Sequence, residues 1–184
     1  MRRLLFAVLA ASPAAAFAGT APTAELQVRD WPAPSRAAAE AMLKEYEKPT
    51  RFNQDMLIWS DDGAWKRTVV YRAPENGSLE QTINYVVPDE KISALERFDK
   101  RLRFDFAAGE LSARSDDERL NYLILNLAEE IVDDKRGVED ARDFERKTEA
   151  LLKSGKTSPY LDGFRFSMDD DDLVLPDRSD PSAR

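Results

Sequence analysis

Carboxylates are the only side chains in this sequence that are numerous enough, and close enough together, for acid–base chemistry. The chain has 35 acidic residues and neither histidine nor cysteine. It therefore cannot use Ser-His-Asp or Cys-His catalysis, or zinc and copper sites built on imidazole or thiolate. Neighbouring acids occur at Asp61-Asp62, Asp116-Asp117-Glu118 and Glu129-Glu130. Their positions favour structural roles, and a carboxylate-based hydrolase, which needs one neutral and one ionised acid, is the alternative.

The densest charge in the sequence is the run Asp169-Asp170-Asp171-Asp172. Ca²⁺ prefers carboxylate oxygens, but the alternating ligands and central glycine of an EF-hand loop are missing here. We predict a solvated acidic linker, with a cation site as the alternative. Gly155-Lys156-Thr157 imitates the end of a phosphate-binding loop, yet Ala150 stands where that loop needs a glycine. These residues are predicted to end a helix, and the sequence indicates no cofactor.

The candidate interaction surface is the hairpin that carries Trp59, Trp65, Lys66 and Arg67. Aromatic rings beside cations can stack on sugars, peptides or the side chains of a partner. Side chains alternate along a strand, so Lys66 and Arg67 should point to opposite faces. We expect one of the two tryptophans to keep part of its ring in solvent near a cation. The alternative is that both tryptophans cap the core.

Apolar patterning predicts an α+β fold in which helices cover one face of an antiparallel sheet of about five strands. The expected order is α-β-β-β-α-β-β-α-α. The first helix is predicted to begin with Ser35 as its cap and to run to about Glu47. A three-strand meander should follow, with these segments and turns: Met56 to Trp59, a turn at Ser60-Asp61-Asp62-Gly63, Trp65 to Tyr71, a turn at Asn76-Gly77, and Leu79 to Val87.

The second half of the chain is predicted to hold a helix, a hairpin and two further helices. The hairpin should place Phe104 and Phe106 on the same face as Leu111 and Ala113. The pattern Ser115-Asp116-Asp117-Glu118 is typical of a capping box. It opens the most apolar helix, which we expect to be the most buried element. A more polar helix should then run to Gly155.

The first 18 residues predict a cleavable signal peptide. Arg2 and Arg3 precede a short apolar segment, and Ala16-Phe17-Ala18 is the small-x-small pattern that predicts cleavage before Gly19. The apolar segment is shorter than the roughly 20 residues that span a membrane. We therefore expect a periplasmic or secreted protein without a transmembrane anchor. The remainder is predicted as follows: an extended leader over 19–34, one domain over 35–176 and a disordered tail over 177–184.

The charge of the chain also restricts its partners. The net charge is −8, and removal of Arg2 and Arg3 makes it −10. This sign disfavours nucleic acids and anionic lipid surfaces, which attract basic patches. With 42% apolar residues and no cysteine, the chain should fold on its core and hydrogen bonds without disulfides.

Two stretches carry a resemblance to known proteins. The segments MLKEYEKPTRFNQDMLIWSDDGAWKRTVVYR and GELSARSDDERLNYLILNLAEEIVDDKRGVEDAR resemble a group of uncharacterised exported bacterial proteins. The helix followed by a meander with a central tryptophan is similar, more loosely, to envelope-assembly domains of the SmpA/OmlA (BamE) kind. The first resemblance implies an exported protein and brings no activity or site residues with it.

These observations favour an exported, non-catalytic binding or interaction module of the cell envelope. Its expected partner is an envelope protein or a glycan. The alternative is the carboxylate-based hydrolase, acting on envelope material. The two differ in geometry, because a hydrolase needs a pocket with two converging acids, whereas a binding module needs an exposed apolar patch or a sheet edge.

Overall fold

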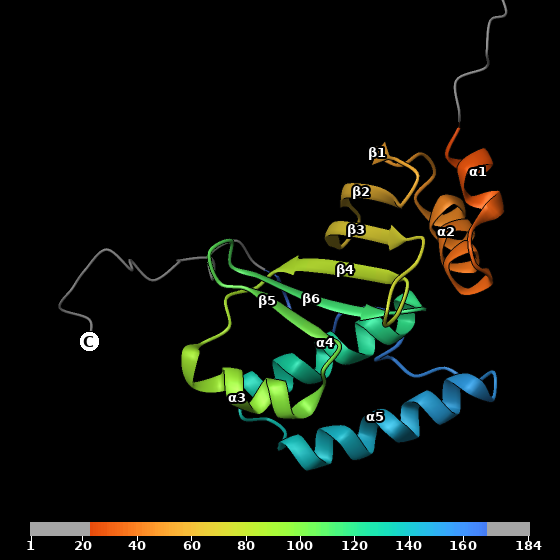
Figure 1. Ribbon diagram of the computed structural model, residues 1–184. Helices are drawn as coiled ribbons and strands as arrows, with labels where there is room; N and C mark the ends of the chain where they lie inside the picture. Colours follow the sequence, from red (N-terminus) through yellow and green to blue (C-terminus); the bar gives the residue numbers. More distant parts are fainter. Residues whose placement is uncertain (1–22, 169–184) are drawn as a thin grey trace, which may run out of the picture.

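Six antiparallel strands form one open sheet in the order β1-β2-β3-β4-β6-β5 (Figure 1). The computed structural model describes residues 23–168. The strands are β1 Arg51–Phe52, β2 Met56–Asp62, β3 Trp65–Tyr71, β4 Leu79–Asn84, β5 Leu102–Asp105 and β6 Glu110–Ser115. The helices are α1 Ala24–Gln27, the 3-10 helix η1 Val28–Asp30, α2 Ala33–Glu45, α3 Asp89–Phe98, α4 Glu118–Val132 and α5 Val138–Lys153. The predicted α+β class is confirmed, with one strand more than the five expected.

The predicted meander is formed by β2, β3 and β4. Thr68 of β3 lies between Trp59 of β2 and Gln81 of β4, and this register buries the same face of all three strands. β2 continues to Asp62, beyond the start of the predicted turn, and β4 ends at Asn84. The second turn requires its glycine: Gly77 has φ +61°, and a Cβ there would lie 2.8 Å from the carbonyl oxygen of Ser115.

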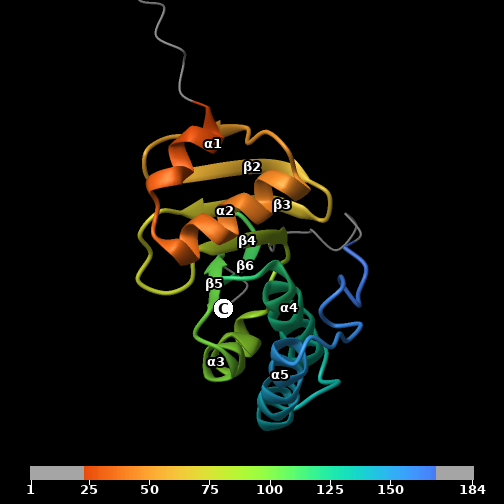
Figure 2. The ribbon, with the colours of Figure 1, turned by 90° about the vertical axis from the view of Figure 1, so that its right-hand side faces the viewer.

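The helices lie on one face of the sheet, as predicted. Figure 2 looks onto this face, with α2 and α4 in front of the strands. α2 packs on the β1 side of the sheet, where Met42 shares a cluster with Leu57 and Trp59. α4 packs on the β5 side with Ile83 and Leu111, and α3 and α5 pack against α4. Among the described residues, no helix covers the opposite face.

The leader predicted as extended is helical where the structure describes it. Thr23 caps α1, its hydroxyl accepting a hydrogen bond from the backbone N–H of Leu26, and η1 follows directly. Val28 and Trp31 are buried in the cluster beneath α2. Burial of these two side chains outweighs the effect of the flanking prolines, which had suggested an extended chain.

Two of the predicted helix caps are wrong. α2 begins at Ala33, with Pro32 before it, and Ser35 lies buried in the first turn. At α4 the cap is Asp117, whose carboxylate accepts a hydrogen bond from the N–H of Arg119 at 3.0 Å. The capping box would have turned Glu118 back towards the backbone of Ser115. Glu118 binds three other side chains instead.

α4 has more buried residues than any other described helix, as predicted. All six residues from Leu123 to Ala128 are 0% exposed. Asn126 is buried as well: its Nδ2 donates to the carbonyls of Tyr160 and Gly163, and its Oδ1 accepts from the N–H of Arg165 at 2.7 Å. This amide fastens the segment after α5 to the core, a contact that the sequence patterns did not predict.

Candidate functional site

Neither predicted tryptophan is exposed. Trp59 is 0% exposed and Trp65 is 1% exposed. The Nε1 of Trp59 donates to the carbonyl of Glu47 at 3.4 Å, within the cluster beneath α2. The expectation that one ring keeps contact with solvent is therefore wrong, and the alternative, that both tryptophans cap the core, is confirmed. Both rings face the helices, whose apolar sides need large partners on this face of the sheet.

Trp65 belongs to a hydrogen-bond cluster centred on Glu118. The Oε1 of Glu118 accepts hydrogen bonds from Nε1 of Trp65 and Nε2 of Gln81, each at 2.6 Å, and from the hydroxyl of Tyr46. Burial and the charge of Glu118 raise the pKa of Tyr122 to about 12. The cluster joins α2, β3, β4 and α4, so its role is to hold these elements together. The ring of Trp65 is therefore not available to a ligand.

Lys66 and Arg67 lie on the face that no described helix covers. Both bind the same carboxylate, that of Glu110: Lys66 Nζ at 3.0 Å and Arg67 at 2.7 Å. The prediction that they point to opposite faces is wrong: Trp65 and Thr68, on either side of the pair, are both buried, and both cations reach the same carboxylate. Burial raises the pKa of Glu110, but the hydrogen bonds from Arg67 and Lys66 outweigh it, so this pKa lies below its usual value.

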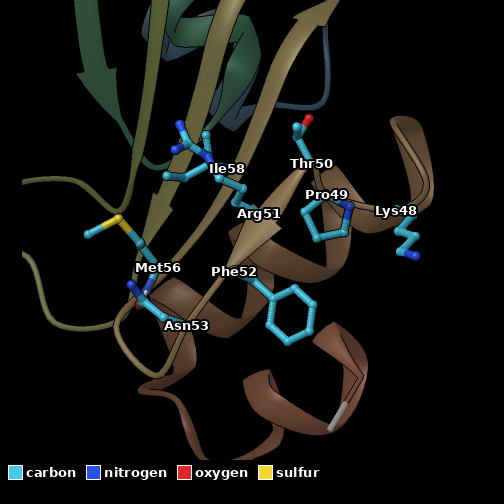
Figure 3. A pocket seen from close by; sticks show the side chains of 8 residues that line it. All are labelled: Lys48, Pro49, Thr50, Arg51, Phe52, Asn53, Met56 and Ile58. Atoms are coloured by element: carbon cyan, nitrogen blue, oxygen red, sulfur yellow. Dashed lines mark hydrogen bonds between the residues drawn. The ribbon is translucent and has the colours of Figure 1, made fainter. Parts of the chain in front are cut away.

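A pocket opens at the β1 edge of the sheet (Figure 3). Its volume is about 600 Å³. The residues that line it come from the segment before β1, from β1 itself and from the start of β2: Lys48, Pro49, Thr50, Arg51, Phe52, Asn53, Met56 and Ile58. We call this the edge pocket. It combines apolar side chains, two cations and the backbone of an edge strand.

Short-range hydrogen bonds hold the edge pocket in shape. The Oδ1 of Asn53 accepts from the N–H groups of Asp55 and Met56, at 2.8 and 3.0 Å, and so closes the tight turn between β1 and β2. The hydroxyl of Thr50 accepts from the N–H of Ser60 at 3.2 Å. Arg51 pairs with Ile58 in the register of β1 and β2. The lining is therefore fixed by the backbone that carries it.

Two cations without an acidic partner among the described residues line the edge pocket. Lys48 and Arg51 are exposed and make no ion pair with any residue between 23 and 168. Lys66 and Arg67, in contrast, share Glu110. Sequence patterns missed this site because β1 is only two residues long, too short to show alternation. The only available signal was two cations separated by Pro49 and Thr50.

A second pocket, of about 460 Å³, lies between α2 and the start of α4. Asp116, Asp117 and Glu118 all line it, which makes it the place where a hydrolase would have its acids. Each of the three is already bound. Asp116 accepts from the N–H and hydroxyl of Ser78, both at 2.8 Å. Asp117 caps α4, and Glu118 holds its three donors.

The other two groups of acids are also bound or lie apart from the pockets. Asp62 ends β2, and burial with the neighbouring charge of Asp61 raises its pKa. Glu129 pairs with Lys135 at 2.7 Å, and Glu130 pairs with Arg136 at 2.5 Å. Among the described residues, no group of three or more potential ligands could hold a metal ion. The run Asp169 to Asp172 lies outside the described residues.

The predicted signal peptide and C-terminal tail also lie outside the part of the chain that the structure describes. No helix within residues 23–168 is long and apolar enough to cross a membrane. The predicted end of α5 is confirmed: Gly155 has φ +76°, and its N–H bonds to the carbonyl of Leu152.

Comparison with known proteins adds no family to this description. No protein-family model, no curated protein and no solved structure matches the chain.

Proposed function

We propose that this protein is an exported, non-catalytic binding module that takes an extended segment of an envelope protein at the edge pocket. The observation that carries the proposal is the pairing, in one pocket of about 600 Å³, of apolar side chains with two cations that have no acidic partner among the described residues. The ligand that matches this lining is a peptide with acidic and aliphatic side chains.

The apolar part of the edge pocket supplies the affinity. Met56 and Ile58 are half-buried on one side of the β1–β2 ribbon, and Phe52 is half-buried on the other side (Figure 3). Burial of apolar surface contributes roughly 25 cal/mol per Å². An aliphatic side chain that covers Met56 and Ile58 would therefore remove exposed apolar surface from both partners, which favours association.

The cations supply the selectivity. The chain as a whole has a net charge of −8, so it repels acidic partners over most of its surface. Lys48 and Arg51 add positive charge at this edge of the sheet. A partner with carboxylates next to its aliphatic residues would meet positive charge beside the apolar lining, which favours one position and orientation.

The edge strand supplies the shape. β1 is the outermost strand, with β2 as its only neighbour in the described sheet. An exposed edge presents backbone groups to an extended segment, which can add to the sheet. β1 has only two residues, so we expect few backbone hydrogen bonds and a larger share of side-chain contacts.

The hydrolase alternative places its chemistry in the second pocket. Asp116, Asp117 and Glu118 each accept hydrogen bonds that join separate elements, and such bonds hold the acids in structural roles. The edge pocket holds no acid at all. The geometry therefore favours binding over hydrolysis.

The test is a titration of the mature chain with two fluorescent synthetic peptides, Glu-Glu-Leu-Ile-Leu and Lys-Lys-Leu-Ile-Leu, followed by fluorescence polarisation. We expect the acidic peptide to bind at least tenfold more tightly. Arg51→Glu should weaken its binding by at least tenfold, which corresponds to about 1.4 kcal/mol.

The matched control is Lys156→Glu, which makes the same change in net charge at an exposed residue beyond α5. It should alter affinity less than twofold. Equal affinity for the two peptides, or equal loss in the two variants, would contradict the proposal.

A further inference from the structure

The sheet has a second edge, at β5, and the side chains along this edge match a second copy of the same strand. β5 is the outermost strand at its end of the sheet, with β6 as its only neighbour among the described strands (Figure 1). We propose that two molecules pair their β5 strands antiparallel about Phe104, which joins their two sheets into one. This contact lies at the opposite end of the sheet from the edge pocket and does not depend on the proposed function.

One residue of β5 has both of its backbone groups available at the edge. The N–H of Arg114 bonds to the carbonyl of Arg101 at 3.1 Å. Alternation therefore directs the backbone groups of Leu102 and Phe104 away from β6, towards the edge. Leu102 is occupied, because its N–H bonds to the carbonyl of Asp99 and its own carbonyl accepts from a guanidinium. Phe104 has no such partner among residues 23–168, so it can exchange two N–H···O=C bonds with Phe104 of a second copy.

Pairing about Phe104 brings opposite charges together. In this register Arg103 of each molecule lies directly across from Asp105 of the other, so a symmetric contact contains two such pairs. Both side chains lie on the face opposite to Leu102 and Phe104, which pack with the core. Opposite charges at facing positions stabilise paired strands. The edge of β5 is therefore complementary in charge to itself.

Both charged groups have unused hydrogen-bonding capacity. Arg103 and Asp105 form no ion pair with a residue between 23 and 168. Within that range Arg103 donates only through Nη1, to the carbonyls of Lys100 at 2.6 Å and Leu102 at 2.8 Å. The Oδ1 of Asp105 accepts from the two N–H groups of the following turn, at 3.1 and 3.0 Å. The Nε and Nη2 of Arg103 and the Oδ2 of Asp105 are thus left for a partner.

Aromatic side chains give the contact an apolar part. The rings of Phe104 and Phe106 are stacked, with centroids 5.8 Å apart and planes at 3°. Phe106 is 38% exposed, which makes it one of the few exposed large apolar side chains in the described chain. In the paired strands Phe104 meets its own counterpart, and Phe106 lies across from Leu102 of the second copy. The rings lose contact with water on association, which favours it.

The β1 edge does not match itself in this way. Pairing of two β1 strands would bring Lys48 and Arg51 of each copy towards the same cations of the other, and like charges at facing positions are destabilising. The net charge of −8 also makes two copies repel each other, so association needs locally matched charges. A twofold contact at β5 is closed, and we therefore expect association to stop at a dimer.

Charge exchange tests the proposal on the full mature chain. Analytical ultracentrifugation from about 10 µM to about 1 mM should show a monomer–dimer equilibrium. Arg103→Glu and Asp105→Arg should each weaken the dimer at least tenfold, because like charges then face each other. A mixture of the two variants should form a heterodimer, because each facing pair again has opposite charges. The control is Arg146→Glu, the same change at an exposed position on α5, which should alter dimerisation less than twofold.

A single introduced thiol reports the register, since the chain has no cysteine. Facing residues of a hydrogen-bonded pair have Cα atoms about 5.5 Å apart, which is within the range of a disulfide. Phe104→Cys should therefore give a disulfide-linked dimer on mild oxidation. The matched control is Phe106→Cys on the same edge. Its two copies would lie four residues apart along the strands, about 13 Å, and should not become linked.

Three results would overturn the proposal: a monomer at every concentration, a dimer that withstands both charge reversals, or linkage through Phe106→Cys in place of Phe104→Cys. Circular dichroism of each variant shows whether it is folded. Asp105 also accepts hydrogen bonds within its own turn, so Asp105→Arg could unfold the hairpin. In that case Arg103→Glu and the two thiol variants decide the question.

Discussion

The indole Nε1 of Trp65 donates a hydrogen bond to Oε1 of Glu118 at 2.6 Å, which joins the start of β3 to the first turn of α4. The same oxygen accepts from Gln81 and Tyr46. Glu118 forms no ion pair with a residue that the structure describes. Three neutral donors, contributed by α2, β3 and β4, thus stabilise one carboxylate at the point where the two halves of the core meet.

Removal of this carboxylate should destabilise the fold. Glu118→Ala leaves the donors of Trp65 and Gln81 without their acceptor, and an unsatisfied buried group costs about 1–3 kcal/mol. We expect a loss of about 2–4 kcal/mol in a urea melt, and a smaller loss for Glu118→Gln, which keeps an acceptor oxygen. Glu139→Ala, which removes only an exposed i,i+3 pair with Arg142, should change stability by less than about 0.5 kcal/mol. Equal losses for Glu118→Ala and Glu139→Ala would refute this role.

α4 should carry a large part of the stability. Leu127 is 0% exposed, so Leu127→Ala leaves a cavity in the core and should cost about 2–5 kcal/mol. The matched control is Leu151→Ala on α5, where the leucine is 38% exposed and the loss should stay below about 1 kcal/mol. A denaturant titration of both variants compares them directly. Similar losses at the two positions would show that α4 is not the centre of the core.

Stability should depend on pH through Glu145. Burial, with the nearby charge of Asp99, raises the pKa of Glu145 to about 8, although Arg101 pairs with it. The folded state therefore binds the proton more tightly than the unfolded state, whose pKa is near 4.5. The contribution of Glu145 to unfolding free energy is fully present below pH 4.5 and is lost as pH rises towards 8, by at most about 1.4 kcal/mol per pH unit.

Glu145→Gln removes this titration. The difference in unfolding free energy between Glu145→Gln and the unaltered protein should grow between pH 5 and pH 8, in favour of the variant. Chemical denaturation at several pH values measures it. A difference that stays constant over this range would show that the carboxyl group ionises normally in the folded state.

Export should be accompanied by cleavage after Ala18. The intact mass of protein purified from its native envelope should correspond to a chain that begins at Gly19. Ala18→Arg should block processing, because the peptidase accepts only small residues at this position, whereas Phe17→Leu should leave it unchanged. Recovery of the full-length chain from the cytosol would contradict the proposed localisation.

Most of the fold could be predicted from the sequence because its strands and helices are long enough to show periodicity. The spacing of Leu123 and Leu127 identified α4, and the glycine at position 77 identified a turn. Short elements escaped prediction. α1 and β1 have four and two residues, too few for any pattern, and they form only because Val28, Trp31 and Phe52 pack beneath or beside α2.

The candidate site could not be predicted from local patterns. Strand alternation placed Lys66 and Arg67 on opposite faces, but in the folded sheet both bind Glu110. The capping pattern assigned Glu118 to the backbone, but tertiary contacts with Trp65 and Gln81 take precedence. The edge pocket depends on sheet order, which decides that β1 has a neighbour on one side only.

The most direct test of the binding function is to map the contact of the peptide Glu-Glu-Leu-Ile-Leu on the ¹⁵N-labelled mature chain by NMR. We predict that the shifted amide signals belong to Lys48, to residues 50–53 and to residues 56–58, and that Arg51→Glu abolishes these shifts while the rest of the spectrum is preserved. Shifts confined to the pocket between α2 and α4, or no shifts at a peptide concentration of several millimolar, would contradict the account.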